Sequence, residues 1–422
     1  MEESFYQGQR LQNYCVNCDI DYGTAKKDDK NFTCDNCGTQ LRTRFTGLAV
    51  SGGGFRAALF HLGSLWRLNE LGWLKRLAEV TSVSGGSITA AYLGFRWKDL
   101  KFDNNGVATN FIDEIVPPVR ALCLKTIDIG NVLAGIIDPF FRPIEHVAAH
   151  YRKELFGQKT LQDLPADDKG PRFTIYATNL QTGADVRFSR PYLADYNLGR
   201  IESPQIQLAT AVAASCALPP ILCPMIIKFS PNAWKDWENG ENNGGELTID
   251  KSKLRSALYL ADGGVYDNLG QERIWDQYAT VLVSDAGAPF RITESTFGFR
   301  FNQLTRAMRA VSIITEQTRA LRKRWLIADM KSSQVRGTYW GITTHIRDYQ
   351  LETAGCAPPL LDDDPMTRSL SLIRTRLNHF SNEEQERLID WGYALTDAAM
   401  RRHVVDKATK PGTLPYPINF NK

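Results

Sequence analysis

The stretch Leu48-Ala-Val-Ser-Gly-Gly-Gly-Phe-Arg-Ala57 decides the fold, because an apolar strand runs into a glycine-rich turn and then into a helix. About thirty residues later, Ser82-Val-Ser-Gly-Gly86 follows another apolar strand in the same order. Alternating strands and helices predict a parallel sheet with right-handed crossovers. The expected elements are strands at Leu48–Val50 and Val80–Val83 and helices at Phe55–Leu71 and Ser87–Phe95.

Composition indicates a globular chain of 422 residues, with 43% hydrophobic and 23% charged residues. This length fits one large α/β domain with appendages, or two domains. The net charge of +3 is too small to favour a nucleic-acid partner. The sequence has no apolar run of the roughly 18 residues that span a bilayer, and its start lacks an apolar leader. We therefore expect a cytoplasmic protein, with peripheral membrane contact as a further option.

A polar module of residues 1–45 carries two cysteine pairs, Cys15-x-x-Cys18 and Cys34-x-x-Cys37. Their spacing matches a tetrahedral zinc site with four thiolate ligands, and Gly38 after Cys37 is typical of a zinc knuckle. Four protein ligands leave no open position, so we expect a structural zinc ion and no catalytic metal. Two disulfides or free thiols are the alternatives.

Residues 46–422 are expected to form the main domain. The segment near 115–143 contains Val-Pro-Pro-Val and Ile-Ile-Asp-Pro-Phe-Phe-Arg-Pro, which predicts a cap or lid, since it is too proline-rich for a continuous helix. Ser381 and Glu384 form a capping box for a C-terminal helix that runs to about Arg402. Other expected elements are strands at Phe173–Ala177, Leu258–Leu260 and Thr280–Ser284, a helix at Leu208–Ala214, and a loop at Asn232–Asp250.

Ser84 lies in a sharp strand-to-helix turn, where a serine hydroxyl can project beyond the sheet as a nucleophile. Ser82 occupies the first position of the usual G-x-S-x-G, so a plain helix N-cap is the alternative. Ser82 itself should still lie in the strand and Ser87 in the helix, which makes both weaker candidates.

The amides of Gly52, Gly53 and Gly54 stand at a helix N-terminus, where they can hold an oxyanion. Gly52, Gly54 and Ala57 also fit the dinucleotide fingerprint G-x-G-x-x-A. That motif needs an acidic residue at the end of the next strand, where Ser82-Val83-Ser84-Gly85 stands instead. The dinucleotide reading is therefore disfavoured.

Asp262 is the candidate base, because it ends an apolar strand and precedes two glycines, which places it at the carboxyl edge of a parallel sheet. No histidine occupies the position expected in a Ser-His-Asp triad. His146 and His150 are four residues apart and suit a metal, but H-E-x-x-H is absent. Nearby aspartates that compete with Asp262 are Asp267, Asp276 and Asp285.

The glycine loop, the Ser84 turn and Asp262-Gly-Gly, in this order, resemble the patatin-like phospholipase family, with some likeness to the cytosolic phospholipase A2 catalytic domain. Ala213-Ala-Ser-Cys-Ala-Leu-Pro-Pro220 resembles a further family element, whereas Ser82 departs from the family's glycine. The resemblance implies a three-layer α/β/α hydrolase with a mostly parallel sheet and a serine-aspartate dyad. The implied roles are Ser84 as nucleophile, Asp262 as base, Gly52, Gly53, Gly54 and Gly85 as the oxyanion hole, and Arg56 as substrate or loop support.

We therefore expect a serine lipid acyl hydrolase of the phospholipase A or lysophospholipase type that acts through an acyl-enzyme on a lipid ester. The run Arg319–Trp325, with Arg306 and Arg309 before it, predicts a basic helix that is either a solvated face or a membrane contact. The alternative function is a regulated effector or interaction protein. In that case the zinc module or the basic helix recognises a partner, and hydrolysis is gated or absent.

Overall fold

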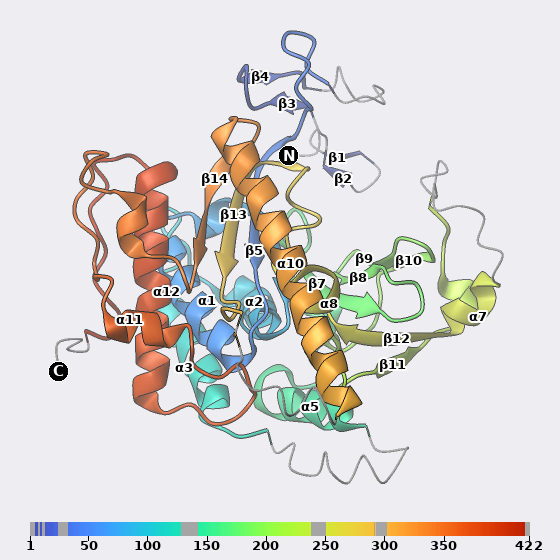
Figure 1. The fold of residues 1–422 in the computed structure, drawn as a ribbon. Coiled ribbons are helices and arrows are strands. Elements are labelled where there is room, and N and C mark those ends of the chain that lie inside the picture. Colours follow the sequence, from blue (N-terminus) through green and yellow to red (C-terminus); the bar gives the residue numbers. More distant parts are fainter. Residues whose placement is uncertain are drawn as a thin grey trace.

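The computed structural model describes residues 5–6, 9–10, 13–23, 33–127, 142–237, 250–290, 292 and 302–417. Its centre is a run of parallel strands in a 10-stranded mixed sheet (Figure 1). In spatial order these strands are β7 (Arg172–Asn179), β6 (Leu77–Val83), β5 (Thr43–Val50), β13 (Tyr278–Asp285) and β14 (Arg336–Gly341). Buried, nearly continuous apolar strands of this kind are what a sheet covered on both faces requires.

An antiparallel extension continues the sheet beyond β7. One branch consists of β8 (Asp185–Phe188), β9 (Tyr192–Asp195) and β10 (Gly199–Glu202). The other consists of β12 (Ala257–Asp262) and β11 (Met225–Lys228). The sequence analysis predicted β12 as a strand but did not predict β8, β9, β10, β11 or the edge strand β14.

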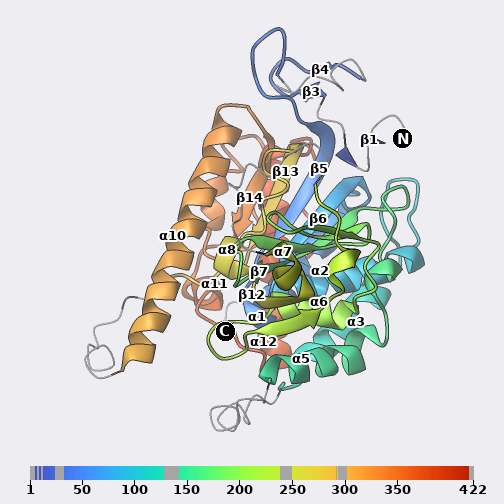
Figure 2. The same cartoon turned by 90° about the vertical axis from the view of Figure 1, so that its right-hand side faces the viewer.

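Helices cover both faces of the sheet, so the predicted three-layer α/β/α architecture is confirmed (Figure 2). One layer contains α1 (Gly54–Glu70), α2 (Gly85–Arg96), α3 (Phe111–Cys123) and α12 (Asn382–His403). The other contains α8 (Gly264–Asp267) and the long α10 (Gln303–Lys331). The remaining α-helices are α5 (Pro143–Tyr151), α6 (Leu208–Ser215), α7 (Lys251–Ser256) and α11 (Pro365–Leu370).

Short elements complete the described chain. The N-terminal module contributes β1 (Phe5–Tyr6), β2 (Gln9–Arg10), β3 (Tyr14–Cys15) and β4 (Ile20–Asp21). Single helical turns are η2 (Leu74–Arg76), η3 (Trp97–Asp99), the π-type η4 (Arg152–Phe156), η5 (Leu161–Asp163), η6 (Pro231–Ala233) and η8 (Ile346–Tyr349). Every helix in the described ranges is too short or too polar to cross a membrane.

Helix α1 is buried along almost its whole length and packs closely against α12. A Cβ on Gly63 would lie 1.9 Å from the carbonyl oxygen of Ile389, and one on Gly392 would lie 2.0 Å from that of Phe60. Arg67 and Asp397 add a buried ion pair of 2.8 Å between the two helices. This packing holds α1 in place, and with it the glycine loop at its N-terminus.

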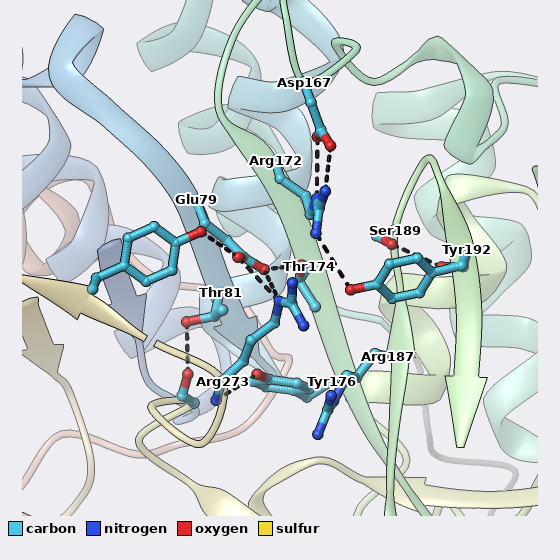
Figure 3. A network of polar contacts seen from close by, with 12 residues as sticks. Glu79, Thr81, Asp167, Arg172, Thr174, Tyr176, Arg187, Ser189, Tyr192 and Arg273 are labelled. Atoms are coloured by element: carbon cyan, nitrogen blue, oxygen red, sulfur yellow. Dashed lines mark hydrogen bonds and ion pairs between the residues drawn. The ribbon is translucent and has the colours of Figure 1, made fainter. Parts of the chain in front are cut away.

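A buried polar network holds the segment before β13 against the sheet (Figure 3). The Glu79 carboxylate on β6 accepts hydrogen bonds from Arg273 Nε (2.9 Å), Tyr278 Oη (2.8 Å) and Thr174 Oγ1 (2.6 Å). Burial raises the pKa of Glu79, but Arg273 and Arg172 outweigh this and hold it at about 2. Glu79 therefore stays ionised and joins β6, β7 and the start of β13.

The prediction of a C-terminal helix is confirmed, because Ser381 Oγ accepts from the N–H of Glu384 (3.2 Å) and the Glu384 carboxylate accepts from that of Ser381 (2.9 Å). As predicted, residues 115–143 do not form one continuous helix, because α3 ends at Cys123, and the cap or lid stays a prediction. Pro117 and Pro118 lie inside α3, whose buried face packs on α1 and α2. That burial offsets the backbone hydrogen bonds that proline cannot make. Residues 128–141 of the predicted lid and 238–249 of the predicted loop lie outside the described residues.

Candidate active site and four-cysteine cluster

Ser84 occupies the turn between β6 and α2 with φ 49° and ψ −122°, a conformation that non-glycine residues rarely adopt. Its N–H donates to Ser215 Oγ (2.8 Å), and its carbonyl oxygen accepts from the N–H of Ser87 (2.9 Å). Small neighbours permit this turn, since a Cβ on Gly86 would lie 2.5 Å from the carbonyl oxygen of Ser51. The backbone at Ser84 is therefore strained and held by specific partners, as at other sites where a serine side chain is presented for chemistry.

The competing serines lie in a buried cluster. Ser87 Oγ is 3.1 Å from Ser82 Oγ and 3.0 Å from Ser215 Oγ. Ser82 and Ser87 are 1% and 0% exposed, whereas Ser84 is 9% exposed. Ser215, at the end of α6, was not predicted as a site residue, although it lies in the Ala213–Pro220 stretch that the sequence analysis quoted.

Asp262 lies beside Ser84 and is almost fully buried. Its carboxylate accepts a hydrogen bond from the N–H of Gly264 (2.8 Å). Its own N–H donates to the carbonyl oxygen of Ala217 (2.8 Å). Burial raises the pKa of Asp262 to about 6, although the nearby Ser84 side chain and the N–H of Gly264 act in the opposite direction.

Strand register explains how these two residues meet. β6 pairs with one edge of β7 as far as Val83 opposite Tyr176, and β8 occupies the other edge of β7. β12 pairs with the same edge of β7 as β6 does, but it runs antiparallel to β7 and ends with Asp262 opposite Ala177. The prediction that Asp262 ends a parallel strand was therefore wrong. The carboxyl ends of β6 and β12 converge head to head along β7, and this brings the Ser84 and Asp262 side chains together.

The glycine loop touches the serine turn. A Cβ on Gly85 would lie 1.9 Å from the carbonyl oxygen of Gly54, and one on Gly52 would lie 3.2 Å from Ser84 Cβ. Gly52 donates its N–H to the carbonyl oxygen of Asn268 (3.1 Å), so that amide is engaged. No described residue accepts a hydrogen bond from the N–H of Gly53, Gly54 or Gly85. Of the four predicted oxyanion donors, these three remain available.

Arg56 is fully buried behind the glycine loop. It donates to the carbonyl oxygens of Ser371 (2.9 Å), Ile373 (2.9 Å) and Ala286 (2.6 Å). The same segment brings the carbonyl oxygen of Thr375 so close to Gly54 that a Cβ there would lie 1.9 Å away. Of the two roles predicted for Arg56, loop support fits this geometry.

His61 lies beneath the loop, with Nδ1 2.8 Å from Ser284 Oγ and Nε2 3.0 Å from the carbonyl oxygen of Ser51. Burial lowers the pKa of His61 to about 4, so the ring is neutral and braces β5 and β13. His146 and His150 belong to no metal-binding cluster in the described part of the chain, where the four cysteines form the one such group.

The competing aspartates are engaged elsewhere. Asp285 accepts from Tyr339 Oη (2.7 Å) and from the N–H of Gly287 (2.8 Å). Asp267 accepts from the N–H groups of Leu269 (3.0 Å) and Glu272 (2.9 Å). Burial raises the pKa of Asp276. Among these carboxylates of the described chain, Asp262 is the one whose pKa the Ser84 side chain affects.

The four cysteine sulfurs of the N-terminal module all lie within 4.8 Å of one another. Cys15 Sγ is 3.6 Å from Cys37 Sγ, and Cys34 Sγ is 3.9 Å from Cys18 Sγ. Thiolates about 2.3 Å from a tetrahedral zinc ion are separated by about 3.8 Å. The donor set therefore fits a four-coordinate metal ion with no open position.

The module also contacts the main domain. Tyr14 and Val16 pack against Ala279 of β13, and the Arg336 guanidinium lies 5.8 Å from the Tyr14 ring centroid. Arg336 also donates to the carbonyl oxygen of Val16 (3.3 Å). These contacts lie at the amino end of the parallel strands, opposite the edge that carries Ser84.

The family model described as "Patatin-like phospholipase" matches residues 48–274. No curated protein matches the chain. Solved structures with a similar chain include human GIVD cytosolic phospholipase A2, at 14% identity and a TM-score of 0.48 over 84% of this chain and 59% of that one.

Two bacterial structures are also similar. VipD from Legionella pneumophila is 16% identical with a TM-score of 0.33, over 86% of this chain and 68% of that one. The complex of SpcU with ExoU from Pseudomonas aeruginosa contains a chain that is 15% identical with a TM-score of 0.25, over 87% of this chain and 76% of that one. The chain thus spans less than two thirds of the length of the human phospholipase.

Proposed function

The chain belongs to the patatin-like phospholipase family, and on that premise we propose that it is a serine lipid acyl hydrolase in which Ser84 is the nucleophile and Asp262 the base. The observation that carries this proposal is the strained turn that presents Ser84 next to a buried carboxylate at the meeting point of two strands, where the Ser84 side chain acts on the pKa of Asp262. A positioned hydroxyl with an adjacent base is what nucleophilic acyl transfer requires.

In the proposed reaction, Ser84 Oγ attacks the ester carbonyl while Asp262 accepts the hydroxyl proton. The N–H groups of Gly53, Gly54 and Gly85 stabilise the oxyanion, supported by the positive N-terminal ends of α1 and α2. The C–O bond of the ester then breaks, and the leaving alcohol takes the proton from Asp262. Asp262 next takes a proton from water, which attacks the acyl-enzyme. As the bond between the acyl carbon and Ser84 Oγ breaks, Asp262 returns the proton to Ser84 Oγ, and the fatty acid leaves.

Burial makes an aspartate a usable base without a histidine. An ordinary aspartate is too acidic to accept a proton readily near neutral pH. Burial raises the pKa of Asp262 to about 6, so the group remains largely ionised near pH 7 and is a stronger base than an exposed carboxylate.

Two exposed apolar residues are neighbours in sequence of residues that support the site. Leu218 is 56% exposed and follows Ala217, which binds the N–H of Asp262. Leu372 is exposed between Ser371 and Ile373, the residues that bind Arg56. Such surfaces suit the acyl chains of a lipid ester, so the proposed substrate is a phospholipid or lysophospholipid.

We further propose that the four-cysteine cluster holds a structural zinc ion. Metal analysis of the purified chain should find about one zinc per chain, and Cys34→Ser should lose it. Thr39→Val is a matched control, because it removes the hydroxyl beside Cys37 without removing a ligand. Zinc retained at full occupancy in Cys34→Ser would contradict this assignment.

A fluorophosphonate probe tests the acyl hydrolase directly, because it modifies an activated serine. The wild-type chain should be labelled and should release fatty acid from phospholipid vesicles, whereas Ser84→Ala and Asp262→Asn should do neither. Ser230→Ala, at an exposed serine, should behave as wild type. Labelling of Ser84→Ala at the wild-type rate would refute the assignment. No labelling of the wild type would favour the alternative of an interaction protein whose hydrolase site is gated or inactive.

A further inference from the structure

The long helix α10 has two halves with different surroundings. In its C-terminal half, Arg319 lies 3.5 Å from Asp285 and donates to the carbonyl oxygen of Ala288 (3.0 Å). Arg322 pairs with Glu272, and Leu326 is fully buried. Arg319 and Arg322 of the predicted Arg319–Trp325 face therefore bind the domain itself.

The N-terminal half of α10 is exposed on almost every side. Met308 and Val311 are each 41% exposed and Ile314 is 64% exposed. Their spacing of three residues places them on one side of the helix. Phe290 and Ile292, just before the helix, are also exposed. We call these five residues, Phe290, Ile292, Met308, Val311 and Ile314, the α10 tip.

The charged residues in the first thirteen residues of α10 have one sign. Residues 303–315 contain Arg306 and Arg309 and no aspartate or glutamate. The first acidic residue of the helix, Glu316, pairs with Arg319 at 3.5 Å. The Arg309 guanidinium lies 4.1 Å from the centroid of the Phe290 ring, so cationic and apolar groups share this surface. This combination is typical of helices that bind anionic membrane surfaces.

The α10 tip lies on the catalytic side of the molecule. β13 and β14 are parallel, and α10 connects them, so α10 runs back across the sheet from its carboxyl edge. Figure 1 shows the N-terminal end of α10 at the side toward which the arrowheads of β5 and β13 point. Ser84 follows β6, which is parallel to β5. In Figure 2 this half of α10 extends away from the body of the domain.

We propose that the α10 tip inserts into the surface of an anionic phospholipid membrane and holds the carboxyl edge of the sheet toward the bilayer. This inference rests on the proposed function, since it supplies the way in which a lipid hydrolase reaches an aggregated substrate. A second copy of the chain is a poorer occupant. Residues 303–315 of each copy contain two arginines and no acidic residue, so a symmetric dimer through this stretch would bring like charges together.

Co-sedimentation with vesicles tests the proposal without catalysis, using the full chain with Ser84→Ala. Vesicles of phosphatidylcholine mixed with phosphatidylglycerol should bind the protein, and vesicles of phosphatidylcholine alone should bind it much more weakly. Val311→Asp with Ile314→Asp should weaken binding by at least about tenfold, because both side chains lose apolar burial. Arg306→Glu should weaken it by about fivefold or more.

Tyr196→Asp is the matched control, because Tyr196 is 45% exposed between β9 and β10, away from α10. It should bind as the parent does. Unchanged binding by the double variant, or equal binding to the two kinds of vesicle, would overturn the proposal. So would a shift from dimer to monomer in the double variant by light scattering, since the tip would then bind a second copy.

A second assay separates this proposal from the function on which it rests. In the catalytically competent background, the tip variant should lose hydrolysis of anionic vesicles but retain hydrolysis of a soluble, monomeric ester. Loss of neither activity would refute the membrane role and leave the hydrolase intact. No hydrolysis of either substrate by the wild type would refute the hydrolase, whereas the sedimentation result would still decide the membrane role.

Discussion

Replacing Asp262 with asparagine should abolish activity and at the same time stabilise the fold. Asp262 is almost fully buried, and burial raises its pKa from 3.8 to about 6. Because the folded-state pKa lies above the unfolded-state value, the ionised carboxylate lowers stability. This penalty grows as pH rises from about 4 to about 6 and is constant above that range.

The two pKa values set the magnitude. At pH 8 the penalty is about 3 kcal/mol, and at pH 5 it is about half of that, because the folded form is then largely protonated. Asparagine removes the charge but weakens the hydrogen bond from the N–H of Gly264 by about 1 kcal/mol. The net gain is about 2 kcal/mol at pH 8, which corresponds to about 2 °C in Tm for a chain of this length.

Differential scanning calorimetry at pH 8 and pH 5 measures this effect, and fluorophosphonate labelling measures activity. The Tm of Asp262→Asn should exceed that of the wild type at pH 8 by more than it does at pH 5, and labelling should fall by at least about 100-fold. Asp195→Asn, at another buried aspartate, is the activity control and should still be labelled. If Asp262→Asn had a lower Tm than the wild type at pH 8, or a Tm difference independent of pH, ionised Asp262 would not destabilise the folded state.

Three further outcomes follow from the site and the core. Wild-type hydrolysis should fall as pH drops through about 6, because protonated Asp262 cannot accept the Ser84 proton; a pH–rate profile flat from pH 5 to pH 8 would contradict this. Ser215→Ala should reduce kcat by about tenfold with little change in KM, since it leaves the Ser84 N–H without its acceptor; a rise in KM alone would argue against a positioning role. Glu79→Gln should destabilise the fold by about 3–5 kcal/mol, because buried Arg273 loses its ionic partner. In denaturant unfolding, a midpoint equal to that of the wild type would contradict this stabilising role of Glu79.

Much of the fold could be predicted because it depends on local patterns. The strand, glycine turn and helix of Leu48–Ala57 appear in the structure as β5 and α1, and the second such unit appears as β6 and α2. The capping box at Ser381 could be predicted for the same reason, since both partners lie within one turn. By contrast, β8, β9 and β10 have short and mixed patterns, and their pairing depends on β7.

Prolines in the sequence do not by themselves fix where a helix ends. Two adjacent prolines predict a break, yet α3 continues through Pro117 and Pro118 because its other residues pack on α1 and α2. The prediction of a basic helix face has a similar limit. A run of arginines gives the charge of a helix, but only the packed structure shows that Arg319 and Arg322 face Asp285 and Glu272.

The sequence by itself determined which residue types stand in the turns: a serine after β6, glycines after β5, an aspartate at the end of β12, and four cysteines at zinc spacing. Only the tertiary structure decided that β12 is antiparallel to β7 and meets β6 on one edge of β7. It also decided that the N–H of Gly52 donates to the carbonyl oxygen of Asn268. The physical reason is the separation along the sequence of the residues that interact. Turn and helix preferences act between neighbours in the chain, whereas strand register and burial are set by residues that are far apart in sequence and meet only when the sheet has formed.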